Sequence, residues 1–509
     1  MNAGNRKKKQ NFIPNAVFYL LVFAATACFA MVQSYGDPPD EVNRFKVVSF
    51  ICRHGRLPHG ADPEVLLDGF GASYAFQPML TYIIQGFLLR FLTLFTADSS
   101  VLLVAARMVN VVFGVLMAYF VRQSARLLWK SPYLQWTFTV MTVFLPQNIF
   151  IHSYINTDSM AMLAVSIICY SLLRAQRTDY DRRDCILLAL GIILCAMSYY
   201  NAYGIILAAI IVFALRYAHI GRGTGAAAAG SVAPSAEMAA ARKGGSTVSE
   251  GGKAAGGRSR LWVEWSPLLR KGIFISVIVL LGIGWWFLRN ALLYDGDIIA
   301  MEARRECAIR TATEEFNPLT RFTYQSSGAS LADMLLETKY VILVLNSFIA
   351  MFGAMDLPTH GLIYLCYRYF WLAALAAALL IPRRLWNRTG DSLWGHREDS
   401  LPESGRKKRL VFYGSMILFC LITVGLSLFY SSTWDFQPQG RYIMPVLIPF
   451  MYVVALGVQK LCGLLEALAL WLGAGLAGGN AAAFLPKAGT GCGRLLCIGI
   501  MVYVLSAFA

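Results

Sequence analysis

The sequence predicts an all-α, polytopic transmembrane helical bundle with about ten to twelve spans. Its 509 residues are 57% hydrophobic and only 15% charged, and the mean hydropathy is +0.54. A soluble chain of this length needs more charge to cover its surface. Apolar runs of about 15–22 residues recur along the chain, close to the roughly 20 residues that cross a bilayer as a helix. Because unpaired backbone groups are costly in lipid, these runs are expected to be helical.

The charged residues and cysteines argue against other classes of protein. The formal net charge of +16 sits mainly in loops between apolar runs, where the positive-inside rule accounts for it without nucleic acid. The eleven cysteines show no CxxC motif and no Cys/His cluster with metal-ligand spacing. Cys52 and Cys307 would lie on the same side of the membrane, so they could pair. No cleavable signal peptide is expected, because the basic residues 6–9 precede a full-length apolar run without a cleavage pattern.

The basic loops predict the orientation in the membrane. Five loops hold 28 of the 45 Lys and Arg residues and are expected in the cytoplasm: 1–12, 122–135, 174–184, 216–271 and 383–409. This assignment predicts spans at 13–34, 101–121, 136–152, 159–174, 185–199, 202–216, 272–288, 361–381, 410–430 and 442–461. Whether 464–477 and 494–508 also span stays open. The N-terminus is then cytoplasmic, and the chain is expected in a bacterial inner or plasma membrane.

Two further apolar stretches, 78–95 and 340–355, cannot cross the membrane without moving the basic loops 122–135 and 383–409 outside. Both are therefore expected to lie on, or dip into, the extracytoplasmic leaflet as juxtamembrane helices. Arg90 in the middle of the first stretch supports this, because a charge at the bilayer centre costs roughly 2.5–3.5 kcal/mol.

The chain is expected to divide into two transmembrane halves. Residues 1–216 form the first, with an outside loop at 35–100, and residues 261–509 form the second, with an outside loop at 289–360. Between them, 217–260 is rich in Gly, Ala and Ser. This segment predicts a flexible cytoplasmic linker, since it cannot bury enough apolar surface to order itself.

The first outside loop begins with the candidate catalytic residues. Gly36-Asp37-Pro38-Pro39-Asp40-Glu41 follows the first span, and His54 lies further along the loop. The two prolines stiffen the exit of the helix and present two carboxylates at the membrane boundary. Such a carboxylate can act as a general base toward a hydroxyl. Taken alone, the acidic pair is more typical of a solvated turn that ends a helix.

A second polar segment, Asn156-Thr157-Asp158-Ser159, is expected outside between two spans. Its spacing favours Asp158 as a cap of the helix that follows. The alternative is that Asp158 lines a site shared with Asp40.

Basic residues at outer span boundaries are the candidates for binding a phosphate, because a guanidinium fork matches its geometry. Arg289 follows Trp285-Trp286 where a span emerges, and Arg441 lies in Gln439-Gly440-Arg441-Tyr442. Lys339 borders the second juxtamembrane stretch. The alternative for Arg289 is snorkelling to lipid headgroups beside interfacial tryptophans. An outer arginine runs against the charge bias, which makes Arg441 the more unusual of the two.

Taken together and in this order, the motifs resemble the GT-C superfamily of membrane glycosyltransferases, in the branch with protein O-mannosyltransferases and the lipid A aminoarabinose transferase. The matching pieces span about residues 14–450. They are PPDE with HGRLP after it, Gln77-Pro78, NTDS, WWFLRN with LYDGD, FGAMD at 352–356, and QGRY. The two stretches that do not cross match the juxtamembrane helices of that family.

The resemblance implies transfer of a sugar from a polyprenyl-phosphate carrier to a hydroxyl of a glycan, lipid or protein acceptor, on the extracytoplasmic face and with inversion. It assigns the catalytic aspartate to Asp40, with Glu41 as a helper, and a second acidic site to Asp158. The leaving lipid phosphate needs fixed positive charge. Three side chains are the candidates for it, in this order: Arg289, Arg441 and Lys339. The other candidates for substrate contacts are Asn156, Gln439 and His54.

Several alternatives stay open. Asn43 and Arg44 have no firm counterpart in the family, and Ser198-Tyr199-Tyr200-Asn201 stands where relatives often carry a basic residue. No cofactor is demanded, although three carboxylates could hold a divalent cation through oxygen ligands: Asp37, Asp40 and Asp158. The competing functions are a transporter or flippase for lipid-linked saccharides and a non-catalytic membrane scaffold. A transporter usually carries charges within its spans and shows internal repeats, whereas no repeat is seen here and the charges lie at outer span ends.

Overall fold

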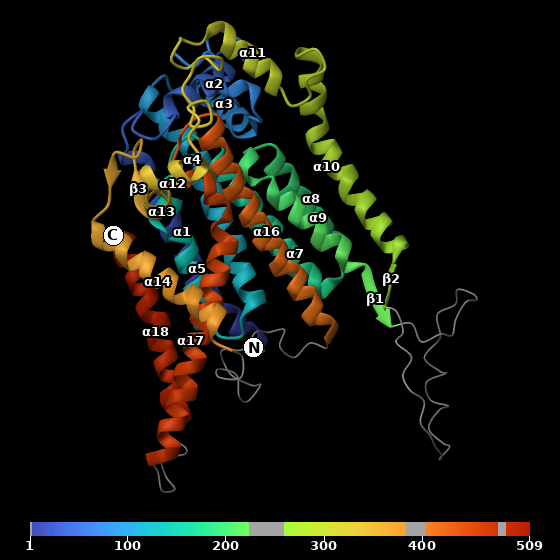
Figure 1. Cartoon of the computed structure of the whole chain (residues 1–509), viewed down its shortest axis with the longest axis vertical. Helices are drawn as coiled ribbons and strands as arrows, with labels where there is room; N and C mark the ends of the chain where they lie inside the picture. Colours follow the sequence, from blue (N-terminus) through green and yellow to red (C-terminus); the bar gives the residue numbers. More distant parts are fainter. Residues whose placement is uncertain (1–2, 223–258, 383–402, 477–484, 509) are drawn as a thin grey trace, which may run out of the picture.

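The computed structural model describes residues 3–222, 259–382, 403–476 and 485–508, and helices dominate them. Within these residues, eight helices are long and apolar enough to cross a membrane (Figure 1). They are Ile13–Val32, Ser99–Leu128, Asp158–Thr178, Trp265–Leu293, Gly361–Leu380, Leu410–Thr433, Gly440–Ala469 and Thr490–Phe508. The predicted all-α, polytopic membrane fold is confirmed, and the chain is a multi-pass membrane protein.

The helices of the first half run in chain order. They are α1 (Ala3–Val32), α2 (Glu41–His54), α3 (Leu80–Leu92), α4 (Ser99–Leu128), α5 (Pro132–Val143), α6 (Pro146–Ile151), α7 (Asp158–Thr178), α8 (Arg182–Ala196) and α9 (Gly204–Arg216). Two short 3-10 turns lie among them, η1 (Tyr74–Phe76) and η2 (Tyr200–Ala202).

The second half holds the remaining helices and one more 3-10 segment. They are α10 (Trp265–Leu293), α11 (Met301–Thr311), α12 (Leu331–Glu337), α13 (Tyr340–Ala350), α14 (Gly361–Leu380), α16 (Glu403–Thr433), η4 (Gly440–Val446), α17 (Leu447–Leu476) and α18 (Leu485–Phe508). Two small antiparallel sheets complete the described structure: β1 (Ala218–Arg222) with β2 (Ser259–Val263), and β3 (Met351–Phe352) with β4 (Leu357–Pro358).

Local sequence signals account for where several helices begin and end. The Asp98 carboxylate accepts hydrogen bonds from two backbone N–H groups at the start of α4, and Asp181 and Asp184 form a reciprocal capping box at the start of α8. The predicted span 136–152 is instead two helices, α5 and α6. Pro146 opens α6, because proline suits a first helical turn but cannot donate the hydrogen bond that would continue α5.

The described residues hold eight helices of spanning length rather than the predicted ten to twelve, because three of the predicted spans form shorter helices. α5, α8 and α9 have 12, 15 and 13 residues, short of the roughly 20 that cross a bilayer unaided. Residues 464–476 of the stretch whose status was open, 464–477, belong to α17, which is unbroken over 30 residues. The last apolar stretch, 494–508, lies in α18.

The two apolar stretches expected not to cross the membrane form short helices. α3 has 13 residues and α13 has 11, or roughly 20 and 17 Å at 1.5 Å per residue. Both fall well short of the ~30 Å hydrocarbon core. This length agrees with the juxtamembrane helices expected at these positions, while their depth in the membrane and the side on which they lie stay predictions.

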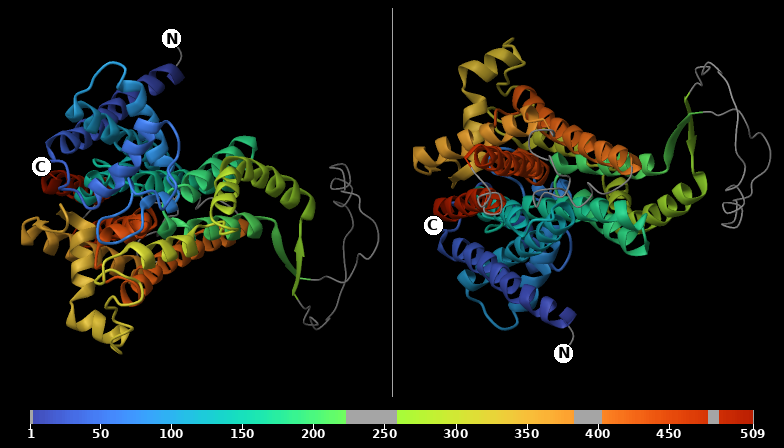
Figure 2. Two further views of the ribbon diagram at one scale, coloured as in Figure 1. Left: turned by 90° about the horizontal axis from the view of Figure 1, so that it is seen from above. Right: turned by 90° about the horizontal axis from the view of Figure 1, so that it is seen from below.

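The helices α2, α3 and α11 gather at one end of the bundle, and the N-terminus and the β1–β2 sheet lie toward the other (Figure 1). α7 is the central helix. Its most apolar stretch is 89% buried inside the protein, and it packs against α4 and α8. α10 is the most open of the eight, with 11% buried, and stands beside α8 at the flank of the bundle (Figure 2). Its exposed apolar surface is suited to lipid.

The ends of the expected linker are ordered. β1 and β2 pair in antiparallel register from Ala218 opposite Val263 to Arg222 opposite Ser259. The rest of the segment predicted as a flexible linker, 223–258, lies outside the described residues, so its flexibility stays a prediction.

Candidate active site

Four charged side chains from distant parts of the chain meet at the end of the bundle that carries α2 and α3. The Nη2 atom of Arg441 donates a hydrogen bond to Oδ2 of Asp40 at 2.6 Å. The same oxygen lies 3.6 Å from Nη2 of Arg44, whose Nη1 donates to Oδ2 of Asp158 at 3.3 Å. Arg44 thus joins the two aspartates into one site. We refer to these four residues as the Asp40 cluster.

The backbone at Asp40 turns its side chain toward Arg441. Asp40 precedes α2 with φ 61° and ψ 4°, a left-handed conformation that aspartate tolerates better than most residues. It occupies the capping position of α2 but makes no side-chain capping hydrogen bond. The Pro38-Pro39 pair restricts the approach to this turn. The carboxylate is therefore not used to stabilise the helix end.

Asp40 is the exposed member of the cluster. Its side chain is 31% exposed, whereas those of Arg44, Asp158 and Arg441 are exposed by 5, 3 and 6%. Burial opposes ionisation of Asp40, but the guanidinium charges of Arg441 and Arg44 outweigh it and lower its pKa to about 2. At neutral pH the cluster therefore presents one ionised carboxylate to a partner from outside the protein.

Arg441 has hydrogen-bonding capacity to spare. Besides Asp40, its Nη2 donates to the hydroxyl of Tyr442 at 3.1 Å, while its buried Nε and Nη1 have no partner in the structure. Unpaired buried donors are costly and rare.

Gly440 allows Arg441 to reach Asp40, because this position has no room for a side chain. A Cβ on residue 440 would overlap the backbone of Phe348 in α13. The segment η4 can thus approach α13 closely and carry Arg441 to Asp40.

The turn at 198–201, which lacks the basic residue often found in relatives, packs beside Arg441. The rings of Tyr199 and Tyr442 stack with centroids 6.4 Å apart. Asn201 donates to the carbonyl oxygen of Tyr442 at 3.1 Å. This turn therefore supports the site through aromatic packing and an amide and supplies no charge.

Arg44 is a site residue that sequence reasoning did not assign. It lies four residues after Asp40 on α2, a spacing that places both on one helix face and could have identified it. Its guanidinium carbon lies 5.1 Å from the ring centroid of Tyr74, and its Nε is buried without a partner. Burial also raises the pKa of neighbouring Tyr82 to about 12, so that hydroxyl is neutral at physiological pH.

Glu41 is held in a separate buried ion pair. Its two carboxylate oxygens accept hydrogen bonds from Nε and Nη2 of Arg107 at 2.8 and 2.5 Å, and both side chains are at most 1% exposed. Arg107 also donates to three carbonyl oxygens at the end of α1, those of Ala30, Gln33 and Ser34. The pair ties α1, α2 and α4 together. Sequence reasoning missed Arg107, although an arginine within an apolar span is a signal in itself.

The predicted helix cap at 156–159 is wrong in its residue. Asp158 is the first residue of α7 and makes no capping hydrogen bond; its carboxylate turns to Arg44. Asn156 supplies the cap, because its Oδ1 accepts from the N–H of Ser159 at 2.9 Å. The Asn156 amide also donates to the carbonyls of Ile151 and Tyr154, so its polar atoms are occupied within the protein.

The other predicted substrate-binding residues lie outside the Asp40 cluster. Arg289 donates to the carbonyl of Pro58 at 2.6 Å and stacks on Trp286. His54, at the far end of α2, contacts Glu64 at 3.1 Å. Lys339 lies immediately before α13 and is exposed. Gln439 lies immediately before η4, two residues before Arg441. Cys52 and Cys307, which could have paired, are both free.

The Asp40 cluster does not fit a divalent cation. Asp40 and Asp158 both face arginines, whose charge opposes another cation nearby. Asp37, the third proposed ligand, accepts a hydrogen bond from the N–H of Ser34 in its own turn. In the parts of the chain that the structure describes, no three His, Cys, Asp or Glu side chains are grouped to hold a metal ion.

Solved structures of two membrane proteins resemble the chain in their arrangement. ArnT from Cupriavidus metallidurans, bound to undecaprenyl phosphate, is 13% identical with a TM-score of 0.46, over 97% of this chain and 76% of ArnT. The oligosaccharyltransferase AglB from Archaeoglobus fulgidus, in complex with an inhibitory peptide and a dolichol-phosphate, is 11% identical with a TM-score of 0.44, over 97% of this chain and 56% of AglB. The chain thus spans little more than half the length of AglB. No curated protein matches the sequence.

A family match covers most of the chain. Residues 48–450 match the family described as predicted membrane protein (DUF2142). The matched region begins within α2, just after Asp40 and Arg44, and includes Asp158 and Arg441. The chain is therefore a member of the DUF2142 family of predicted membrane proteins.

Proposed function

We propose that this protein is a GT-C-type membrane glycosyltransferase that moves a sugar from a polyprenyl-phosphate carrier to an acceptor hydroxyl, with Asp40 as the general base. The observation that carries the proposal is the Asp40 cluster. A partly exposed, ionised carboxylate lies beside two arginines that have buried N–H groups without partners. The ordered motifs at 38–41, 156–159 and 439–442, which supply Asp40, Asp158 and Arg441, also resemble that superfamily.

The chemistry needs a base and a positively charged site for the leaving group. The acceptor oxygen forms a bond to the anomeric carbon while the bond from that carbon to the phosphate oxygen breaks. The acceptor proton passes to Asp40. The polyprenyl phosphate leaves as an anion, which guanidinium donors stabilise without a general acid. A single displacement of this kind inverts the anomeric centre.

The arginines suggest an order of events. A carboxylate with a pKa of about 2 is a weak base near neutral pH. A donor phosphate bound beside the guanidinium of Arg441 would share the charge that now stabilises the Asp40 carboxylate. The pKa of Asp40 would then rise toward its ordinary value. Donor binding would in this way strengthen the base that acts on the acceptor.

This proposal changes the roles predicted from sequence. Arg441 and Arg44 become the phosphate-facing cations in place of Arg289 and Lys339. Asp158 becomes a positioning residue that acts through Arg44, since only Asp40 among the two aspartates is substantially exposed. Glu41, fully paired with Arg107, becomes a structural residue.

The test compares Asp40→Asn with Asp37→Asn, a matched control in the same turn. Purified variants in liposomes would be supplied with an extract of polyprenyl-phosphate sugars and acceptors, and released polyprenyl phosphate would be measured by mass spectrometry. D40N should lose on the order of 100-fold or more of the release rate while remaining folded, as a cooperative thermal unfolding transition would show, and D37N should keep the rate. Normal turnover by D40N excludes Asp40 as the base.

The side of the membrane on which the site lies is tested separately. A cysteine at Thr96, between α3 and α4, should react with an impermeant thiol reagent from the extracytoplasmic side, and one at Thr178 should not. The reverse pattern overturns the orientation predicted from the basic loops.

A further inference from the structure

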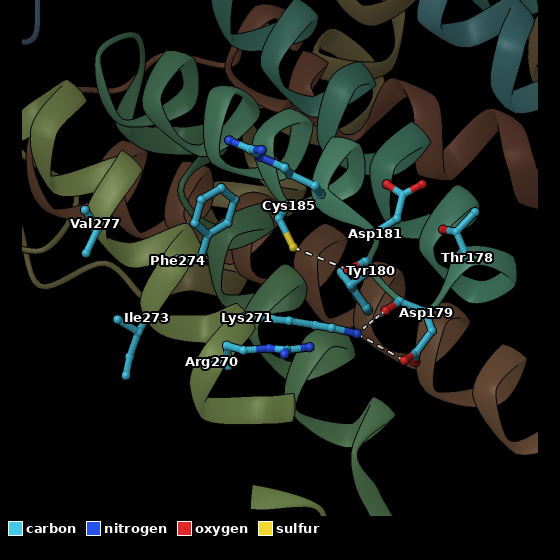
Figure 3. A pocket seen from close by; sticks show the side chains of 11 residues that line it. Thr178, Asp179, Tyr180, Asp181, Cys185, Arg270, Lys271, Ile273, Phe274 and Val277 are labelled. Carbon is cyan, nitrogen blue, oxygen red and sulfur yellow. Dashed lines mark hydrogen bonds and ion pairs between the residues drawn. The ribbon is translucent and has the colours of Figure 1, made fainter. Parts of the chain in front are cut away.

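A cavity at the other end of α7 forms a second candidate binding site. α7 has 21 residues and runs from Asp158, in the Asp40 cluster, to Thr178, which lines the cavity. The two places are thus about 30 Å apart along one helix, the thickness of a bilayer hydrocarbon core. The cavity, about 670 Å³ in volume, lies between the α7–α8 turn and α10 (Figure 3). It faces the cytoplasmic leaflet in the predicted orientation.

One wall of the cavity is apolar. Ile273, Phe274 and Val277 of α10 line it, and these side chains are 61, 36 and 48% exposed. Their i, i+1, i+4 spacing places them on one face of the helix. α10 is also the most open of the eight long helices in the described structure. The wall therefore offers an exposed apolar surface along α10, which suits an acyl chain.

The acidic groups of the rim are neutralised within the protein. Asp179 pairs with Lys271 at 3.1 Å, which Figure 3 shows, and with Arg216 at 2.8 Å. Asp181 pairs with Arg174 at 2.8 Å. These ion pairs weaken the repulsion that the two carboxylates would exert on a bound anion.

Two cations of the rim remain without a partner. Arg182 and Arg270 both line the cavity and are exposed. Neither forms a hydrogen bond or ion pair with any residue that the structure describes. They come from two helices that pack against each other, α8 and α10. Guanidinium groups match a phosphate well.

We propose that this cavity binds an anionic phospholipid, with its phosphate held by Arg182 and Arg270 and one acyl chain along Ile273, Phe274 and Val277. Basic pockets between helices on the cytoplasmic side are typical sites for anionic headgroups. The lipid would fill the space between α8 and α10, where the protein leaves apolar surface uncovered. This binding site is independent of sugar transfer at the Asp40 cluster.

The charge is tested by binding. The purified full chain in detergent would be mixed with phosphatidylglycerol or phosphatidylcholine, and retained lipid would be measured by native mass spectrometry. Phosphatidylglycerol should be retained preferentially, and R182Q/R270Q should weaken its binding on the order of tenfold or more. R183Q/R310Q removes the same charge from exposed positions outside the cavity and should bind as the wild type does. Equal retention of the two lipids, or unaltered binding by R182Q/R270Q, overturns the proposal.

Two further measurements test the apolar wall and the source of the anion. Val277→Trp fills the wall and should lower phosphatidylglycerol retention, whereas Leu280→Trp, at an exposed position of α10 that does not line the cavity, should not. Equal effects of the two tryptophans contradict an acyl chain on this wall. Inorganic phosphate at millimolar concentration should not displace the lipid. Displacement would show a site for small anions and sink the proposal.

Discussion

The guanidinium of Arg441 donates a 2.6 Å hydrogen bond to the carboxylate of Asp40, a residue 401 positions earlier in the chain. This contact joins η4, at the entry to α17, to the turn that links α1 and α2. It brings an N-terminal and a C-terminal segment of the chain together at the one carboxylate of the cluster that is substantially exposed. This contact lowers the pKa of Asp40 and holds its carboxylate in place.

The first prediction concerns the arginine of this contact. Arg441→Gln should lower the rate of sugar transfer on the order of 100-fold, because a donor for developing negative charge is lost from a largely buried position. Arg441→Lys should recover only part of the rate, since an ammonium cannot reproduce the guanidinium fork. Arg289→Gln is the comparison: its guanidinium bonds to the Pro58 carbonyl and should matter less. A larger loss in R289Q than in R441Q would return the phosphate site to Arg289.

The second prediction concerns pH. In the free enzyme, burial is outweighed by Arg441 and Arg44, and the pKa of Asp40 is lowered to about 2. Ionised Asp40 is then present throughout pH 4–8, and kcat/KM should show no acid limb from it in that range. With donor phosphate bound to Arg441, the pKa should rise, so the acid limb of kcat should lie at higher pH than that of kcat/KM. Coincident limbs in the two profiles contradict donor-induced strengthening of the base.

The third prediction separates Glu41 from Asp40. Glu41→Gln leaves the Arg107 guanidinium buried without its counter-charge, which should cost roughly 3–5 kcal/mol of stability. Thermal unfolding in detergent should show a larger loss for E41Q than for D40N, because the Glu41–Arg107 pair is fully buried whereas Asp40 is 31% exposed. Replacing both partners, as E41L/R107M, should recover part of the loss, because no unpaired charge remains. If E41Q unfolds like the wild type but loses turnover, Glu41 acts in the reaction after all.

The fourth prediction concerns the close approach of η4 to α13. Gly440→Ala should reduce transfer strongly, because the new Cβ overlaps the backbone of Phe348 and displaces Arg441 from Asp40. Gly425→Ala is the matched control, since a Cβ there meets nothing within 4 Å and alanine is the better helix former. Turnover and thermal unfolding of both variants would be compared. Full activity in G440A would show that the placement of Arg441 tolerates a shift of η4.

Much of the fold could be predicted from the sequence because a bilayer acts on each segment separately. Hydropathy identifies most of the long helices, and loop charge predicts two apolar stretches that do not cross, which form the short helices α3 and α13. The lengths were harder to predict. A break such as that before Pro146 depends on one backbone hydrogen bond, and hydropathy averages over it.

The candidate site could be predicted only in part, because its contacts join segments far apart in the chain. Asp40, Asp158 and Arg441 each stand in a recognisable motif, yet sequence does not show that Arg44 lies between the two aspartates. Arg289 and Arg441 look alike at a span boundary. Only packing separates an arginine bound to a carbonyl from one with buried N–H groups left over. The capping error at Asp158 is a displacement of two residues, within the usual uncertainty of a helix start.

The pairing of β1 with β2 has a practical consequence for handling this protein. Because Arg222 and Ser259 are register partners, the chain leaves and re-enters the described structure at adjacent points. A short turn can close a gap of that width, so the intervening segment is a natural place to shorten the polypeptide or to graft a rigid fiducial domain for electron microscopy. Either change would leave the connection from α9 to α10 in place, and it would do so at the opposite end of the molecule from Asp40.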